Sequence, residues 1–174
     1  ANSDWSSDVC SSDLSYNNIQ DANAALNIVR EFDEPFAVGL KHMNPCGAGL
    51  GADVVEAWKK VYEGDKTSIF GGIVAFNREV NLEVAQLLKP IFLEIVMAPS
   101  FAPDALELLR AKKNLRVLKV NMEGSVKEQM QCVSVNGGLL VQNQDLTIVP
   151  VTASQTVTEA VPTEGQIVDL NFTW

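Results

Sequence analysis

The sequence predicts a layered α/β domain built on a largely parallel β-sheet. From residue 21 to residue 120, stretches with helical spacing of apolar residues alternate with short apolar runs, and this alternation is typical of α/β domains. The apolar runs are almost continuous, as expected for strands that are covered on both faces. The composition, 47% hydrophobic and 20% charged residues, is sufficient for a sizeable core.

Local signals give the bounds of the elements. Helices are expected from Asp21 to about Phe32, from Asp53 to Gly64, from Asn81 to Leu88 and from Pro103 to Leu109. Strands are expected at 36–40, at the end of 67–76, at 93–98 and at 115–120. Beyond them, the apolar runs on either side of Asn136-Gly137-Gly138 predict a hairpin or a bent strand, residues 145–166 show no clear period, and an amphipathic element begins at Asp169.

Composition and charge restrict the classes of function. The net charge of −9 and the pI of about 4.5 argue against a nucleic-acid binder, because phosphate backbones attract basic surfaces. The negative charge does not exclude binding of a small phosphate ligand, since such a ligand needs only a few local hydrogen-bond donors. No apolar run reaches the roughly 18 residues of a membrane span, and no signal peptide is visible. The three cysteines match neither a disulfide framework nor a zinc spacing, so we expect a cytoplasmic protein without a metal.

The candidate catalytic residues are Lys41 and His42, at the point where the buried strand 36–40 should meet solvent. His42 is the only histidine of the chain, and a turn rich in proline and glycine is expected after it. A neutral imidazole can take a proton near pH 7, and a neighbouring lysine can stabilise charge on an acyl oxygen. The pair therefore suggests group transfer with proton removal from the nucleophile. The alternative is a strand end that is merely polar.

Other polar positions allow two interpretations each. Gly71 permits close approach of a ligand or simply a tight turn. Glu94, an acid within an apolar run, either accepts hydrogen bonds from a ligand amine or points to solvent from an edge strand. Asn18 either binds a ligand or shapes the turn before the first helix. Cys46 could be a nucleophile beside His42, but no third orienting group is near, and a small packed residue is the preferred interpretation.

Five sequence blocks, in order, resemble one known family. They are SYNNI at 15–19, KHMNPCG at 41–47, SIFGGIVA at 68–75, APSF at 98–101 and GGLLVQ at 137–142. Together they resemble the formyltransferase domain of the bacterial bifunctional family that joins AICAR transformylase to IMP cyclohydrolase. The resemblance covers about residues 14–174.

The resemblance implies formyl transfer from 10-formyltetrahydrofolate, a co-substrate, to the 5-amino group of AICAR in purine biosynthesis. It implies that His42 accepts the proton, that Lys41 stabilises the transition state, and that Gly71 and Glu94 contact AICAR; Asn18 is a weaker match. The implied fold is a three-layer α/β/α, cytidine-deaminase-like subdomain with a mostly parallel sheet. The implied assembly of the full-length protein is a homodimer.

The chain also departs from the family pattern. Residues 1–14, rich in serine and aspartate, stand where an Arg-Tyr pair is expected, and we expect a non-native or disordered tail there. Residues 15–174 are then expected to be the first part of the transformylase domain, without its C-terminal part and without the cyclohydrolase. Such a fragment is expected to be inactive alone. The alternative function is a non-catalytic nucleotide-binding or interaction module.

Overall fold

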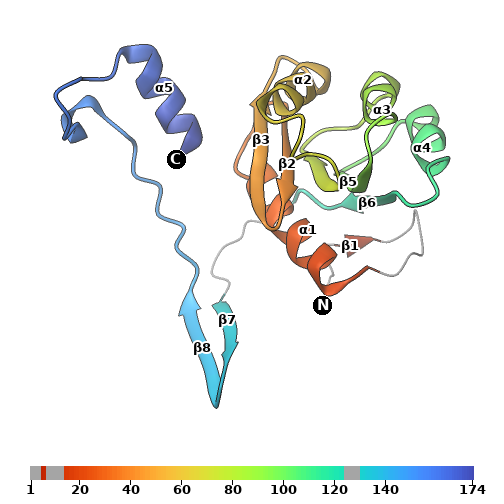
Figure 1. Ribbon diagram of the computed structural model, residues 1–174, viewed down its shortest axis with the longest axis horizontal. Coiled ribbons are helices and arrows are strands. Elements are labelled where there is room, and N and C mark those ends of the chain that lie inside the picture. Colours follow the sequence, from red (N-terminus) through yellow and green to blue (C-terminus); the bar gives the residue numbers. More distant parts are fainter. Residues whose placement is uncertain (1–4, 7–13, 124–129) are drawn as a thin grey trace. The chain divides into compact units, whose positions relative to one another are not determined.

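The computed structural model describes residues 5–6, 14–123 and 130–174. It divides into two compact units, Ala1–Val126 and Lys127–Trp174. Figure 1 shows the first unit as a sheet with helices and the second as a hairpin, an extended segment and a helix. Most of the expected tail at 1–14 lies outside the described residues, so that expectation stays a prediction; Trp5–Ser6 form a short strand, β1.

The first unit contains a six-stranded sheet in the order β1-β6-β5-β4-β2-β3. Its other strands are β2 (Phe36–Lys41), β3 (Asn44–Leu50), β4 (Gly72–Phe76), β5 (Leu93–Ala98) and β6 (Arg116–Val120). Within the described residues, β3, β4, β5 and β6 run in one direction, and β1 and β2 run in the other. The sheet is therefore mixed and mostly parallel, as predicted.

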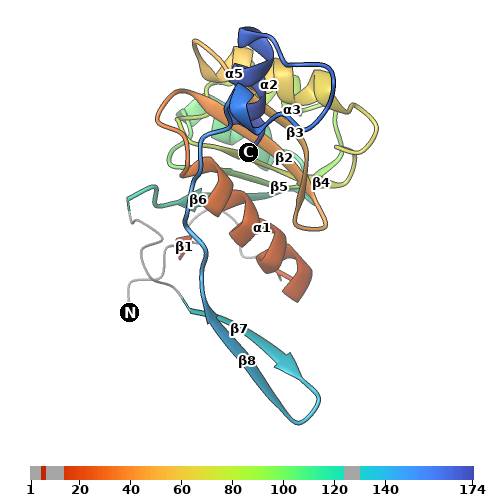
Figure 2. The same ribbon diagram turned by 90° about the vertical axis from the view of Figure 1, so that its left-hand side faces the viewer.

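Helices cover both faces of this sheet. Figure 1 shows α1 (Tyr16–Val29) on one face and α2 (Val54–Gly64), α3 (Leu82–Leu88) and α4 (Pro103–Arg110) on the other. Every residue of β4 is buried, as expected for a strand covered on both sides. The three layers confirm the predicted α/β class, and Figure 2 shows the same arrangement from the side.

The start of the first helix differs from the prediction. The helix begins at Tyr16 rather than at Asp21, because Ser15 forms a capping box with Asn18. The Ser15 hydroxyl accepts a hydrogen bond from the Asn18 backbone N–H at 3.1 Å, and the Asn18 side-chain oxygen accepts one from the Ser15 N–H at 3.2 Å. Asp21 therefore lies in the second turn of α1, where it cannot cap the helix.

The segment after His42, for which the sequence predicts a turn rich in proline and glycine, is instead a strand: Pro45, Gly47 and Gly49 belong to β3. Proline is tolerated there since β3 is an edge strand. Gly47 and Gly49 let α2 lie directly on the strand: a Cβ at Gly47 would be 2.2 Å from the Val61 carbonyl oxygen, and one at Gly49 would be 2.6 Å from that of Ala57.

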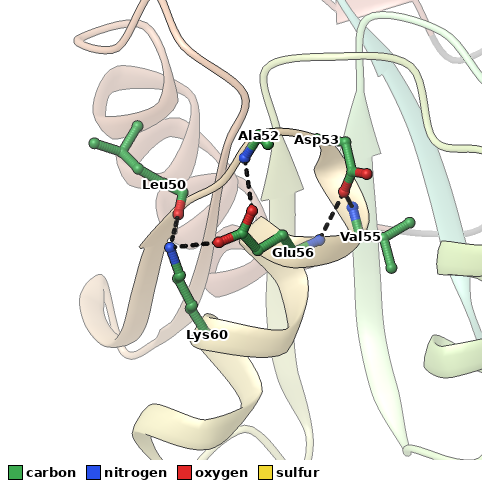
Figure 3. A network of polar contacts seen from close by, with 6 residues as sticks. All are labelled: Leu50, Ala52, Asp53, Val55, Glu56 and Lys60. Atoms are coloured by element: carbon green, nitrogen blue, oxygen red, sulfur yellow. Dashed lines mark hydrogen bonds and ion pairs between the residues drawn. The ribbon is translucent and has the colours of Figure 1, made fainter.

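The connection from β3 into α2 is held by a polar network (Figure 3). Asp53 caps α2 by accepting hydrogen bonds from the Val55 and Glu56 N–H groups at 2.9 and 2.8 Å. Lys60 then donates to the Leu50 carbonyl at 2.7 Å and pairs with Glu56 at 2.9 Å. Because Leu50 ends β3, these contacts fix the helix against the strand.

The second unit contains the predicted hairpin, β7 (Met130–Val135) and β8 (Gly138–Asn143), with Gly137 at a φ of 86° in its turn. A 3-10 turn (Ala153–Gln155) and α5 (Glu164–Thr173) follow. The helix thus begins five residues before the expected Asp169. None of residues 130–174 is buried. Among the described residues, no helix has the length and apolar character needed to cross a membrane.

Candidate functional site

Lys41 and His42 lie at the carboxyl end of β2, as predicted, at the edge of the sheet where β4 and β5 begin. Because β2 is antiparallel to β4, the carboxyl end of β2 lies beside the amino ends of β4 and β5. Gly71 immediately precedes β4, and Glu94 is the second residue of β5. The structure therefore brings these four of the five predicted site residues to the same end of neighbouring strands.

Lys41 connects the β2 end to the segment before β4. Its Nζ donates a hydrogen bond to the Phe70 carbonyl oxygen at 2.9 Å, and the Gly71 N–H donates to the Phe92 carbonyl at 2.8 Å. Gly71 has a φ of 71°, in the left-handed region that glycine adopts without strain. The tight-turn interpretation of Gly71 is thus correct, and a ligand contact at its backbone stays a prediction.

His42 and Met43 form the two-residue loop between β2 and β3, and both have left-handed backbones. Their φ angles are 53° and 65°, the pattern of a type I′ hairpin turn, which favours asparagine and glycine. For other residues this conformation costs about 1–2 kcal/mol each. The turn is held by the Asn44 side chain, which donates to the His42 carbonyl at 2.8 Å, and by Asp21, which accepts the Met43 N–H at 2.7 Å. The His42 side chain is exposed.

We expect the substitution Met43→Gly to stabilise the chain. Glycine removes the left-handed strain but has more freedom in the unfolded state, so a net gain of about 0.5–1 kcal/mol in the free energy of unfolding is expected. Met43 is 49% exposed, so little packing is lost. Urea unfolding measures this change; a destabilised Met43→Gly variant would show that the turn is not strained.

Glu94 and Asn18 form a hydrogen-bonded pair. Asn18 is 7% exposed, and its Nδ2 donates to Glu94 Oε2 at 2.7 Å. Since the Asn18 oxygen accepts the Ser15 N–H, both ends of this amide bind the protein itself. The solvent-pointing interpretation of Glu94 on an edge strand is wrong, because β5 lies inside the sheet and the Glu94 side chain is half-buried.

Three large apolar side chains are exposed on segments that border these polar residues. Met43, Phe70 and Phe92 are 49%, 62% and 43% exposed, and the two phenyl rings lie 5.2 Å apart. Exposed aromatic surface of this kind is a common feature of sites that bind a planar ligand. No spacing in the sequence marks the two phenylalanines, because their contact depends on the pairing of β4 with β5.

Cys46 is not placed as a reactive nucleophile. Its thiol donates to the Gly39 carbonyl at 3.4 Å, and its side chain packs against the core. Burial is the main cause that raises the pKa of the Cys46 thiol; the Asp65 carboxylate also raises it, and Lys41 lowers it by a smaller amount. Fewer thiolates are therefore present near neutral pH than for an ordinary cysteine, which argues against the nucleophile hypothesis.

Alkylation with iodoacetamide at pH 7.5 tests this argument within one molecule. We expect Cys46 to react about tenfold more slowly than the exposed Cys132, as measured by mass spectrometry of the peptides. Labelling of Cys46 at a rate equal to or higher than that of Cys132 would contradict this argument and support Cys46 as a nucleophile. In the described part of the chain, no three histidine, cysteine, aspartate or glutamate side chains gather into a group that could hold a metal ion.

The fold is similar to two solved structures. RibD from Acinetobacter baumannii aligns with a TM-score of 0.48 and 12% identity over 57% of this chain and 35% of that one. The dCMP deaminase of the cyanophage S-TIM5 aligns with a TM-score of 0.45 and 10% identity over 59% of this chain and 98% of that one.

Sequence relatives are much closer. The protein from Anoxybacillus flavithermus named bifunctional purine biosynthesis protein PurH is 56% identical over 162 residues, which are 93% of this chain and 32% of that protein. The protein of the same name from Bacillus mycoides is 52% identical over the same lengths. The chain thus spans about a third of the length of the curated relatives that it matches. The family model described as the AICARFT/IMPCHase bienzyme matches residues 5–174. This match covers nearly the whole sequence, and the chain belongs to the AICARFT/IMPCHase bienzyme family.

Proposed function

We propose that this chain supplies the proton-transfer pair for formyl transfer from 10-formyltetrahydrofolate to the 5-amino group of AICAR, in purine biosynthesis. The proposal is supported by the family, by the names of the relatives, and by one structural observation. That observation is the position of Lys41 and His42 at the carboxyl end of β2, beside the amino ends of β4 and β5 that carry Gly71 and Glu94.

The chemistry requires one base and one cation. The AICAR amine attacks the formyl carbon, so that a new C–N bond forms while the bond from that carbon to the folate nitrogen breaks. The amine loses a proton, which the exposed His42 ring accepts, and one proton is returned to the departing folate nitrogen, so that the imidazole is neutral again after the transfer. Negative charge develops on the formyl oxygen, and the Lys41 ammonium stabilises it.

The Lys41 ammonium can donate a hydrogen bond to the formyl oxygen while it keeps its hydrogen bond to the Phe70 carbonyl. An ammonium has three N–H donors, and the bond to the Phe70 carbonyl uses one of them. That bond also fixes the direction of the side chain, which lowers the cost of orienting the cation during reaction.

The remaining residues are proposed to bind the substrates. The Glu94 carboxylate and the Gly71 backbone contact AICAR, and the Asn18 amide holds Glu94 in place at 2.7 Å. The exposed rings of Phe70 and Phe92 offer an apolar surface for a planar ring of a ligand. Because the chain spans a third of its relatives, we propose that turnover, a cytoplasmic location and a homodimeric assembly belong to the longer protein.

The test is a chimera in which this chain replaces the matching 162 residues of the Anoxybacillus flavithermus relative. We expect AICAR-dependent release of tetrahydrofolate from 10-formyltetrahydrofolate, and no measurable release by the 174-residue chain alone. The variant Lys41→Gln should lower kcat about 100-fold or more with a smaller change in KM, since the cation acts on the transition state.

Two outcomes would contradict the proposal. An effect of Lys41→Gln on KM alone would limit Lys41 to binding. Tight nucleotide binding by the 174-residue chain that is unaffected by Lys41→Ala would favour a non-catalytic binding module.

A further inference from the structure

We propose that Asp21 is a positioning residue for His42: its carboxylate fixes the left-handed turn from which the imidazole projects. The inference deepens the proposed function and rests on it for the role of His42. The carrying observation is the hydrogen bond from the Met43 N–H to Asp21 Oδ1 at 2.7 Å, between residues 22 positions apart in the chain.

Asp21 contacts the turn from a separate element, α1. Asn18 and Asp21 are three residues apart in this helix, so they lie on one face of it. Asn18 holds Glu94 on β5, and Asp21 holds the backbone between His42 and Asn44. One helix face thereby connects the proposed base to the carboxylate proposed to bind the substrate.

The turn needs such an anchor because its side chains contribute little burial. Each of the four residues from His42 to Pro45 is exposed, so side-chain packing does little to fix the turn; besides the pairing of β2 with β3, it is held by the Asn44 bond to the His42 carbonyl and by the Asp21 bond to the Met43 N–H. His42 and Met43 adopt φ angles of 53° and 65°, in the left-handed region that only a small fraction of non-glycine residues occupies. A carboxylate accepts hydrogen bonds only, and a bond to a charged acceptor is stronger than one to a neutral acceptor. Together with Asn44, Asp21 therefore holds the turn in the conformation that sets the direction of the His42 Cα–Cβ bond.

Nuclear magnetic resonance of the 174-residue chain, prepared without a histidine tag, tests the contact directly. His42 is the only histidine, so its ring protons give a single set of signals. In Asp21→Ala we expect the Met43 amide to exchange with solvent about tenfold faster and the His42 ring signals to shift or broaden, because the anchoring bond is lost.

Two matched variants separate positioning from general damage to the helix. Asp21→Asn keeps an acceptor oxygen and should retain slow Met43 exchange and the His42 signals. Asn23→Ala changes an exposed residue of the same helix and should leave both unchanged. Unaltered Met43 exchange and His42 signals in Asp21→Ala, or equal changes in Asn23→Ala, would overturn the proposal.

Kinetics of the chimera complete the test. We expect Asp21→Ala to lower kcat about tenfold with KM changed less than about twofold, and Asp21→Asn to restore most of the rate, because a misdirected base affects the reaction more than binding. A wild-type kcat in Asp21→Ala would overturn the positioning role. If the chimera instead shows no formyl transfer, the proposed function fails, while the resonance experiment still decides whether Asp21 fixes the turn.

Discussion

The substitution His42→Gly is expected to lower kcat of the chimera by about 10²–10⁴-fold, the contribution that a general base commonly makes. The change removes the imidazole and leaves the turn intact, because glycine adopts the φ of 53° without strain. The lost rate can then be ascribed to the ring rather than to a distorted backbone. The measurement is the AICAR-dependent release of tetrahydrofolate at saturating substrates.

Met43→Gly provides the matched control for this substitution. It places glycine at the other left-handed position, with a φ of 65°, and keeps both His42 and the backbone N–H that binds Asp21. We expect its kcat at saturating substrates to fall far less than that of His42→Gly, since the proposed base is unchanged and loss of the exposed Met43 side chain affects substrate binding, and hence KM, rather than proton transfer. A similar loss in both variants would assign the effect to the turn and remove His42 from the mechanism.

The substitution Gly47→Ala is expected to destabilise the first unit by about 3 kcal/mol or more, above the usual cost of overpacking. The new Cβ would lie 2.2 Å from the Val61 carbonyl oxygen, and a backbone atom cannot turn aside as a side chain can. Helix α2 would have to move away from β3, against the polar network of Figure 3 that fixes its first turns. We expect Tm to fall by about 6–12 °C.

Circular dichroism during thermal unfolding measures this change, and Gly138→Ala is its control. A Cβ at Gly138 meets no atom within 4 Å, so its effect should stay within about 0.5 kcal/mol. An unchanged Tm in Gly47→Ala would mean that α2 does not lie on β3 as described.

Local signals were sufficient to predict most elements of the first unit. Asp53 and Asn81 cap α2 and α3, Pro103 begins α4, and β5 spans the predicted residues. Strand β3 could not be predicted, because proline and closely spaced glycines are ordinary turn signals. Their place in a strand depends on the edge position of β3 and on the contact with α2, both of which are non-local.

The candidate site was predictable only in part. The exposure of His42 at the end of β2 followed from the apolar run before it, and the grouping with Gly71 and Glu94 followed from the family resemblance. The hydrogen-bond partners of these residues could not be predicted from the sequence, because the contacts are non-local. Asn18 and Glu94 are 76 residues apart in the chain, and Asp21 and Met43 are 22 residues apart. The catalytic and binding roles of Lys41, His42, Gly71, Glu94 and Asn18 stay predictions.

Chemical rescue of the His42→Gly chimera by imidazole examines the proton-accepting role most directly. If the ring of His42 takes the proton from the AICAR amine, added imidazole should restore formyl transfer, and the restored rate should rise with pH as the neutral form of imidazole becomes dominant near pH 7. Full turnover without imidazole, or a restored rate that falls as the neutral form accumulates, would contradict this role for His42.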